Sequence, residues 1–370
     1  MGCRMKFKVE KTAFAEAVGL ASRAASTRNN ALPALSGVKL ELSGSHLTVT
    51  CTDNDLAIRH SIVVNGITDG TAVTDARRLS DVVKVLEEGA VTISLDNEAV
   101  TISSGRSKAT LRALVASDFP PVTEATTDPV SLPAAEFAEA LRQVVRAAAR
   151  DLQKPQLTGV LMAVDGDGMR LVATDSFRLA VKKMRHGNLI GARDFAVVPG
   201  RALAELSRML GAGGDASLSV SADRATFRVG SASLSTSLVS AEFPKYEQLI
   251  APKLPNKVVV EREPLLHALR RCRVLARENT PVRIEIGAET VRLVARTTDG
   301  QEEFVDELDS TLTGAELVIG FNPEYLADGI EAVAGESASI ETSDPLKPAV
   351  IRGVGDDDYL YLLMPQRLSV

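Results

Sequence analysis

Two sets of arginines in this 370-residue chain recur at the spacing of an α-helix. Residues three or four apart lie on one face of a helix, so each set is expected to form one basic stripe. A row of guanidinium groups suits electrostatic binding of a polyanion, although a single surface arginine is usually only solvated. The two sets are Arg142, Arg146 and Arg150, and Arg270, Arg273 and Arg277.

Residue types that support catalysis are present, but their spacing matches no known catalytic or metal-binding motif. The four histidines are scattered, and the chain contains neither the Gly-Lys of a phosphate-binding loop nor a Gly-x-Ser-x-Gly motif. Residues 165–168 read Asp-Gly-Asp-Gly, but no calcium-loop glycine and glutamate follow, so a hairpin turn is the better interpretation. Cys3, Cys51 and Cys272 are too few and too widely spaced for a disulfide framework or a zinc site. We therefore expect no catalytic residue, no metal and no cofactor.

The net charge of −6 would ordinarily argue against a nucleic-acid partner. The acidic residues, however, lie mostly in stretches that read as strands and turns, whereas the arginine sets lie in stretches that read as helices. If sheets face outward and helices inward in a closed arrangement, an acidic chain acquires a basic interior. The chain has no membrane-length apolar run and no signal-like start, which predicts a cytoplasmic protein that contacts no membrane.

The elements that carry these arginines are repeated along the chain. Phe119-Pro120 and Phe243-Pro244 each follow an alternating apolar run, and the residues around them recur at one fixed offset. Residues 76–86 correspond in this way to residues 200–210, and residues 321–333 align with both. The unit is roughly 120 residues long, which is the size of a domain. We expect three similar domains, at residues 1–125, 126–253 and 254–370.

Each copy has the same plan twice, with a short strand, a helix and then further strands. Apolar residues at helical spacing predict helices over 12–24, 134–150 and 262–277, and second helices follow later in each copy. Runs of period two, broken by glycine, asparagine and aspartate, predict antiparallel strands between them. The expected fold class is α+β with antiparallel sheets.

Six stretches resemble, in order and spacing, the beta subunit of bacterial DNA polymerase III, the sliding clamp family. They are RNNALPALSGV (28–38), SGRSKATL (104–111), VATDSFRLAV (172–181), FPKY (243–246), GAELVIGFNPEYLADGI (314–330) and YLLMPQRL (361–368). The resemblance covers essentially the whole chain from Met5. It implies a non-catalytic processivity factor, a head-to-tail homodimer closed into a ring whose helices surround duplex DNA without reading its sequence. It also implies that polymerase subunits, the clamp loader and repair proteins dock through short linear peptides.

The resemblance assigns residues to each of these contacts. It places Arg28, Arg77 and Arg201 at positions that face DNA, and Arg150, Gln153 and Lys154 in a loop that touches DNA. The remaining predicted DNA contacts are the stripe members Arg142, Arg146, Arg270, Arg273 and Arg277. The partner-peptide pocket falls on Leu157, Thr174, Phe177, Arg178, Leu179, Pro244, Leu249, Pro348, Leu362, Met364, Pro365 and Arg367. The dimer contact falls on Ala109 and Leu111 in one copy and on Val274 and Leu275 in the other.

Two positions depart from the family pattern. Ser176 and Phe177 stand where the family often has Gly-His, which leaves the partner preference open. Ala109 stands where a bulky aromatic residue is usual, and the smaller apolar area could weaken closure of the ring. Two other classes of protein are less consistent with the sequence. An enzyme would need a recognisable set of catalytic residues, which the sequence does not contain. A repeat scaffold that binds only proteins would leave the arginine stripes without a role.

Overall fold

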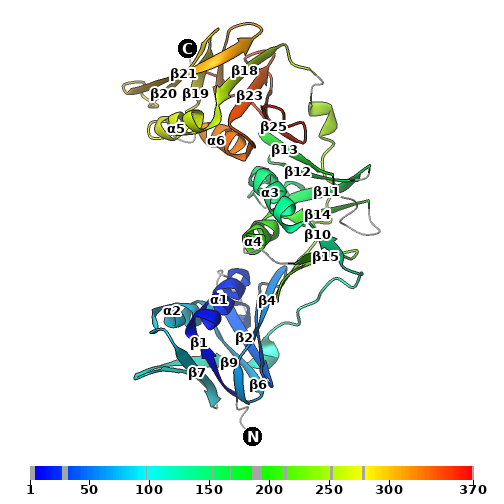
Figure 1. The fold of residues 1–370 in the computed structure, drawn as a ribbon, viewed down its shortest axis with the longest axis vertical. Helices are drawn as coiled ribbons and strands as arrows, with labels where there is room; N and C mark the ends of the chain where they lie inside the picture. The colour runs from blue at the N-terminus through cyan, green and yellow to red at the C-terminus, as the bar shows by residue number, and fades with distance from the viewer. Residues whose placement is uncertain are drawn as a thin grey trace. The chain divides into compact units, whose positions relative to one another are not determined.

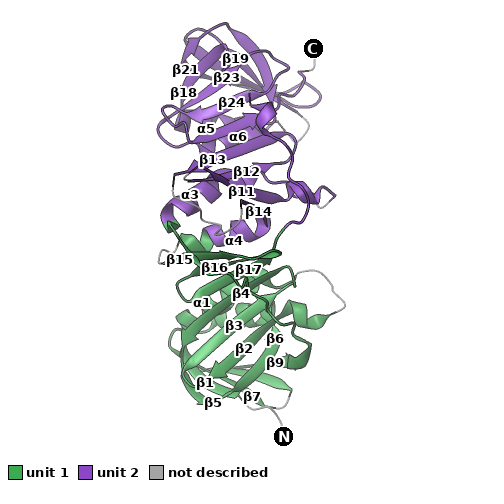
Figure 2. Cartoon of the chain, turned by 90° about the vertical axis from the view of Figure 1, so that its right-hand side faces the viewer, with its two compact units in different colours: residues 1–134, 208–238 green, residues 135–207, 239–370 purple. Residues whose placement is uncertain are grey.

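The computed structural model describes residues 5–26, 32–96, 98–151, 153–166, 168–185, 194–211, 215–250, 253–276 and 280–368. Arg28 and Arg277, two of the predicted DNA contacts, lie outside these ranges. The chain forms two compact units, residues 1–134 with 208–238 (unit 1) and residues 135–207 with 239–370 (unit 2), as Figure 2 shows. The boundary between the units runs through the segment predicted as the middle domain. Of the described helices, none is long and apolar enough to cross a membrane.

Unit 1 is built on an antiparallel sheet, to which helices α1 (Lys11–Ala21) and α2 (Ala76–Val85) are added (Figure 1). Strand β1 buries Met5, Phe7 and Val9 and exposes the residues between them, as a period of two requires. Within its described part, thirteen strands pair in the order β10 (Val130–Leu132), β15 (Ala216–Val220), β16 (Arg224–Val229), β17 (Ala232–Ser237), β4 (Leu56–Val63), β3 (His46–Thr52), β2 (Gly37–Ser43), β6 (Gly70–Asp75), β9 (Ser107–Leu114), β8 (Ala99–Ser104), β7 (Ala90–Asp96), β1 (Met5–Glu10) and β5 (Asn65–Thr68).

Unit 2 repeats this plan with α3 (Ala134–Val144), α5 (Arg262–Cys272) and α6 (Pro323–Ala332), and with most of α4 (Gly200–Leu210). Asn322 caps α6, because its side-chain oxygen accepts from the backbone N–H groups of Glu324 and Tyr325. Among its described residues, twelve strands pair in the order β14 (Phe195–Pro199), β11 (Gly159–Asp165), β12 (Gly168–Thr174), β13 (Arg178–Met184), β25 (Tyr359–Leu363), β24 (Ala349–Gly353), β23 (Ser337–Thr342), β18 (Asn256–Glu261), β21 (Glu303–Thr313), β20 (Thr290–Arg296), β19 (Val282–Ile286) and β22 (Leu317–Phe321). The predicted α+β class with antiparallel sheets is confirmed.

The helix that was expected over residues 134–150 is shorter than its apolar pattern indicated. α3 ends at Val144, a 3-10 turn follows over Val145–Ala147, and the chain is extended at Ala148. A 3-10 turn has three residues per turn, so the four-residue spacing of the arginines no longer places them on one face. Arg142, Arg146 and Arg150 therefore do not form the continuous stripe that was predicted. Arg273 likewise lies one residue beyond the end of α5.

The internal repeat extends to single hydrogen bonds in the turns before β4 and β13. Asn54 and Ser176 occupy the same place and have φ angles of 81° and 82°, which are unusual for residues other than glycine. In both turns the threonine two residues earlier accepts from this residue's N–H, with N···Oγ1 distances of 3.1 and 3.2 Å. Glycine adopts such a φ angle without strain, which fits the glycine that the family resemblance implies at Ser176.

Candidate functional site

Each unit contains one pairing between strands of neighbouring repeats. In unit 1, β4 pairs with β17 from Leu56 opposite Thr236 to His60 opposite Ala232, which we call the first junction. In unit 2, β13 pairs with β25 from Arg178 opposite Leu363 to Lys182 opposite Tyr359, which we call the second junction. The second junction positions the predicted partner-binding residues.

The second junction presents an apolar surface on the side of the sheet that faces away from α6. Tyr361 lies on the helix side, because its hydroxyl donates to the Tyr325 carbonyl of α6, and its neighbours Leu360 and Leu362 therefore face the opposite way. The buried residues on that opposite face form what we call the apolar floor, and Tyr246 covers it together with Phe243, Ile250 and Leu254. The floor consists of Val172, Leu179, Val181, Val350, Leu360 and Leu362.

The fold brings Leu179 and Leu362 together in this floor, where they are only 1% and 3% exposed. The accessible predicted residues lie around it, and we call Phe177, Leu249 and Met364 the rim. Phe177 is 57% exposed and Met364 is 39% exposed, and the Met364 backbone N–H donates to the Phe177 carbonyl at 2.9 Å. Of the other predicted pocket residues, Leu157 and Thr174 are buried, Pro348 and Pro365 are half-buried, and Pro244 and Arg367 are exposed.

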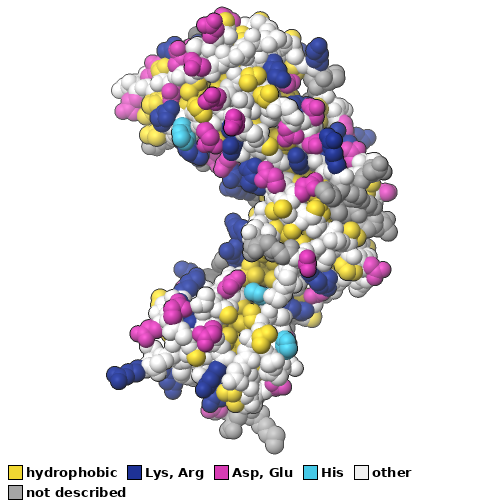
Figure 3. Space-filling model, in the orientation of Figure 1, with side chains coloured by type: hydrophobic (Ala, Val, Ile, Leu, Met, Phe, Trp, Pro, Cys, Tyr) yellow, Lys and Arg dark blue, Asp and Glu magenta, His cyan; other side chains and the backbone are white. Residues whose placement is uncertain are grey.

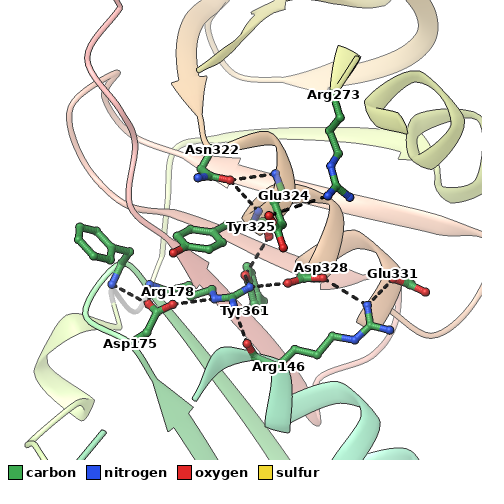
Figure 4. Close-up of polar contacts among 11 residues, drawn as sticks. Arg146, Asp175, Arg178, Arg273, Asn322, Glu324, Tyr325, Asp328, Glu331 and Tyr361 are labelled. Carbon is green, nitrogen blue, oxygen red and sulfur yellow. Dashed lines mark hydrogen bonds and ion pairs between the residues drawn. The ribbon is translucent and has the colours of Figure 1, made fainter. Parts of the chain in front are cut away.

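Arg178 lies on the helix side of the sheet and does not face the apolar floor (Figure 4). Its guanidinium donates to Asp175 at 2.9 Å, to Asp328 of α6 at 2.6 Å and to the Arg146 carbonyl at 2.6 Å. It also stacks on the Tyr325 ring at 4.2 Å. Burial alone would lower the pKa of Arg178, but Tyr361, Asp328 and Asp175 outweigh burial and raise it. Arg178 therefore lies on the helix side of the sheet, and its assignment to the partner pocket stays a prediction.

Arg142 and Arg146 also bond within unit 2. Arg142 donates to both carboxylate oxygens of Glu139 and to the Glu331 carbonyl at 2.9 Å. Arg146 pairs with Glu331 and, at 3.3 Å, with Asp328. The hydrogen bond from Arg146 holds the pKa of Glu331 below its ordinary value. These two arginines attach α3 and the turn after it to α6, although their side chains stay 38% and 45% exposed.

Other predicted DNA contacts are exposed. Arg150, Lys154 and Arg270 make no ion pair with another described residue, and Gln153 is exposed beside them. Arg77 lies 3.9 Å from Asp81 and Arg273 lies 3.9 Å from Glu324, which are loose pairs. Arg201 is exposed at the start of α4.

A groove of about 1250 Å³ lies in unit 1 between α1, α2, the end of α4 and the turn that joins β16 to β17. Figure 3 shows Lys and Arg side chains beside α1 and α2, with acidic groups between them. Arg23, Arg77, Lys84 and Arg208 line this groove together with several serines. Lys84 lies seven residues after Arg77 on α2, so helical spacing could have found it, whereas only the fold brings Arg23 beside Arg77.

The predicted dimer residues lie near strand edges. Residues 107–112 of β9 pair with β8, and residues 303–309 of β21 pair with β20. In the described parts of the chain, no strand pairs with the other edge of either segment. Ala109 and Leu111 are half-buried on β9, and beyond the end of α5 Val274 is 77% exposed and Leu275 is half-buried.

Comparison with known proteins gives one consistent result. The chain matches the N-terminal, central and C-terminal domain models of the DNA polymerase III beta subunit over residues 5–123, 131–245 and 247–367. It is 31% identical to the Beta sliding clamp of Streptomyces coelicolor, over 99% of this chain and 100% of that protein. It is 30% identical to the Beta sliding clamp of Escherichia coli K12, over 98% and 100%.

Solved structures agree. The DNA polymerase III beta subunit of Thermotoga maritima superimposes with a TM-score of 0.89 at 26% identity, covering 99% of this chain and 100% of that one. The sliding clamp of Bartonella birtlesii bound to griselimycin superimposes with a TM-score of 0.91 at 28% identity, with the same coverage.

Proposed function

The chain belongs to the DNA polymerase III beta subunit family, the bacterial sliding clamps, and from that premise we propose how its two units perform the clamp function. A sliding clamp is a processivity subunit and not a catalyst. Two copies close head to tail into a ring around duplex DNA in the cytoplasm. The ring holds the DNA by topology, and no base needs to be read.

The observation that carries the dimer is the pair of free strand edges. β4 and β13 are equivalent strands, since each follows the same threonine-aspartate turn, and β21 follows the corresponding Thr298-Asp299 of the third copy. β9 and β17 precede the two Phe-Pro corners, and β25 is their counterpart in the third copy. β4 pairs with β17 and β13 pairs with β25, which leaves residues 303–309 of β21 and 107–112 of β9 as the equivalent segments, each with one edge that no described strand covers. Pairing β21 of one copy with β9 of another completes the series and closes a ring.

Charge complementarity supports this pairing. The exposed face of β9 carries Lys108 and Arg112, and the exposed face of β21 carries Glu303 and Glu307. Opposite charges at a strand edge guide pairing, while like charges discourage pairing with the wrong edge. Because Ala109 contributes little apolar area, this junction depends on charge more than the two internal junctions do.

Duplex DNA contacts exposed cations on the helix side of the two units. These are Arg77, Arg150, Lys154 and Arg270, with Gln153, Arg201 and Arg273 beside them, and Arg23 and Lys84 are added from the groove in unit 1. Arg142 and Arg146 are left out, since their guanidinium groups are bonded inside unit 2. Arg28 and Arg277 stay predictions outside the described residues. A diffuse set of phosphate contacts centres the duplex without arresting it.

Polymerase subunits, the clamp loader and repair proteins dock at the rim of the second junction through short peptides. A few apolar side chains against Phe177, Leu249 and Met364 bury little area, so affinity is expected to be on the order of micromolar. Met364 can repack around different partners because its side chain is flexible and unbranched.

The test of the ring uses charge reversal on the two edges. Lys108→Glu with Arg112→Glu makes both edges acidic, and Glu303→Lys with Glu307→Lys makes both edges basic. Each double variant should weaken self-association by about a hundredfold or more in sedimentation experiments, because like charges then meet. An equimolar mixture of the two variants should restore the dimer. The matched control is Lys6→Glu with Lys8→Glu on β1, a strand that is paired on both sides.

Retention on DNA is then measured with the restored heterodimer and the parent protein. After loading onto a nicked circle by the clamp loader, both should remain on the circle and be released when it is cut. Double variants that stay dimeric, or protein that stays bound to the cut DNA, would contradict the proposed ring.

A further inference from the structure

The turn that carries Phe177 is organised around Asp175. One carboxylate oxygen of Asp175 accepts from the backbone N–H groups of Phe177 and Arg178, at 2.9 and 3.0 Å. The other oxygen accepts from the Arg178 guanidinium at 2.9 Å. The guanidinium is thus fixed to the same turn that presents the exposed Phe177 ring.

The other side of this guanidinium is fixed to α6. Asp328 accepts from it at 2.6 Å, and the Tyr325 ring lies 4.2 Å from it. The Phe177 ring packs in turn against Tyr325, with 6.5 Å between the ring centroids. Phe177, Tyr325 and Arg178 therefore form a connected group in which only Phe177 is largely exposed.

The first junction shows what this arginine adds. The equivalent turn has Leu56 in place of Arg178, yet Asp53 accepts from the Leu56 N–H at 2.9 Å and Thr52 donates to the Leu56 carbonyl at 3.0 Å. The turn therefore forms without a guanidinium. What the guanidinium supplies is the attachment of the turn to α6.

We propose that Arg178 is a positioning residue for partner binding, which fixes the rim residue Phe177 relative to α6 and does not itself touch the partner. This inference rests on the proposed function of the rim. Phe177 and Met364 are joined by a backbone hydrogen bond, so a turn that moves away from α6 disturbs both. A lysine cannot replace Arg178, because one ammonium group cannot reach Asp175, Asp328 and the Arg146 carbonyl together.

The test measures binding of a fluorescein-labelled peptide that carries one glutamine followed by leucine and phenylalanine. Arg178→Lys and Asp328→Asn should each weaken binding about tenfold, the effect of losing a charge-assisted hydrogen bond. The double variant should bind no more weakly than Arg178→Lys alone, because both changes break one connection. Leu249→Ser is the control at the rim, and its effect should add to that of Asp328→Asn.

Two further measurements separate positioning from a general loss of structure. In Arg178→Ala, millimolar guanidinium should restore peptide binding, whereas ammonium at the same ionic strength should not. Near-parental binding by Asp328→Asn, or additive effects of Arg178→Lys and Asp328→Asn, would mean that Arg178 contacts the peptide directly and would overturn the inference. If the parent protein itself ignores the peptide while remaining a dimer, the rim is not the docking site, and both proposals about it fail.

Discussion

The two internal junctions use the same strand pairing but differ in the surface that they present. Across the second junction, Leu179, Leu362 and Val350 stand opposite one another in a row. In the first junction the same row is Ala57, Ser235 and Thr226. Each row lies beneath a linker that begins at a Phe-Pro corner. The corner is Phe119-Pro120 for the first junction and Phe243-Pro244 for the second.

Directional bonds close the linker over the first junction. Thr226 and Ser235 share a hydrogen bond of 2.6 Å, and the Ala125 N–H of the linker donates to Thr226 at 2.8 Å. Glu124 of the same linker pairs with Arg59 at 3.2 Å and with Arg228 at 2.5 Å. A foreign peptide could displace this linker only by leaving these groups unpaired.

The second junction is closed mainly by apolar contact, to which the linker adds a hydrogen bond from Arg170 to the Tyr246 hydroxyl at 2.8 Å. Phe243, Tyr246 and Ile250 cover the aliphatic floor, and neighbouring rim side chains remain exposed. Apolar contacts lack direction, so side chains from different partners can use such a surface equally well. The comparison supports the proposal that partners dock at the second junction and not at the first.

The largest change should come from making the second junction resemble the first. Leu362→Ser places a hydroxyl in the apolar floor and leaves a cavity, which should lower the free energy of unfolding of unit 2 by about 3–5 kcal/mol. The change in the free energy of unfolding is measured by denaturant titration, with hydrogen exchange of the β13 and β25 amides as the readout. The control Val354→Ser changes an exposed valine in the same unit and should have little effect. Equal effects of the two changes would contradict the packing assigned to the floor.

A smaller change should follow from releasing the linker of the first junction. Glu124→Gln keeps the shape of the side chain but removes the charge between Arg59 and Arg228, which should cost unit 1 about 1–2 kcal/mol. Hydrogen exchange in β16 and β17 should quicken while β25 stays unchanged. Glu87→Gln, at an exposed position of unit 1, serves as the control. Faster exchange at β25 instead would show that the linker does not act locally.

The smallest change should be a difference in pH response. Burial lowers the pKa of His60 in the first junction, so the folded state prefers the neutral ring. Stability of unit 1 should therefore fall as pH drops below the ordinary histidine value of 6.5, and His60→Gln should abolish this fall. In unit 2 the lowered pKa of Glu331 stabilises the fold above the ordinary value of 4.5, and this contribution should be lost only at more acidic pH. If the stabilities of both units changed over the same pH range, this difference between His60 and Glu331 would be contradicted.

Much of the architecture could be predicted from the chain alone. The alternation in residues 5–10 and 359–363 specified strands, and the repeated Thr-Asp turns and Phe-Pro corners revealed equivalent elements. The pairing of Leu179 with Leu362 could not be read in this way. These residues are far apart in sequence, and nothing local selects which strand of the third copy lies beside β13.

The sequence by itself determined the periodic features of this protein, namely the strands, the helix starts, the repeat and the family, because these depend on neighbouring residues and on local backbone preference. Only the tertiary structure decided what the arginines do. Helix α3 ends at Val144, and acidic groups on α6 bind Arg146, which spacing and charge had left indistinguishable from Arg150. They also bind Arg178, which the family resemblance had placed in the partner pocket. An arginine's role depends on which carboxylate lies within reach of its guanidinium, and for Arg146 and Arg178 that carboxylate comes from a distant part of the chain.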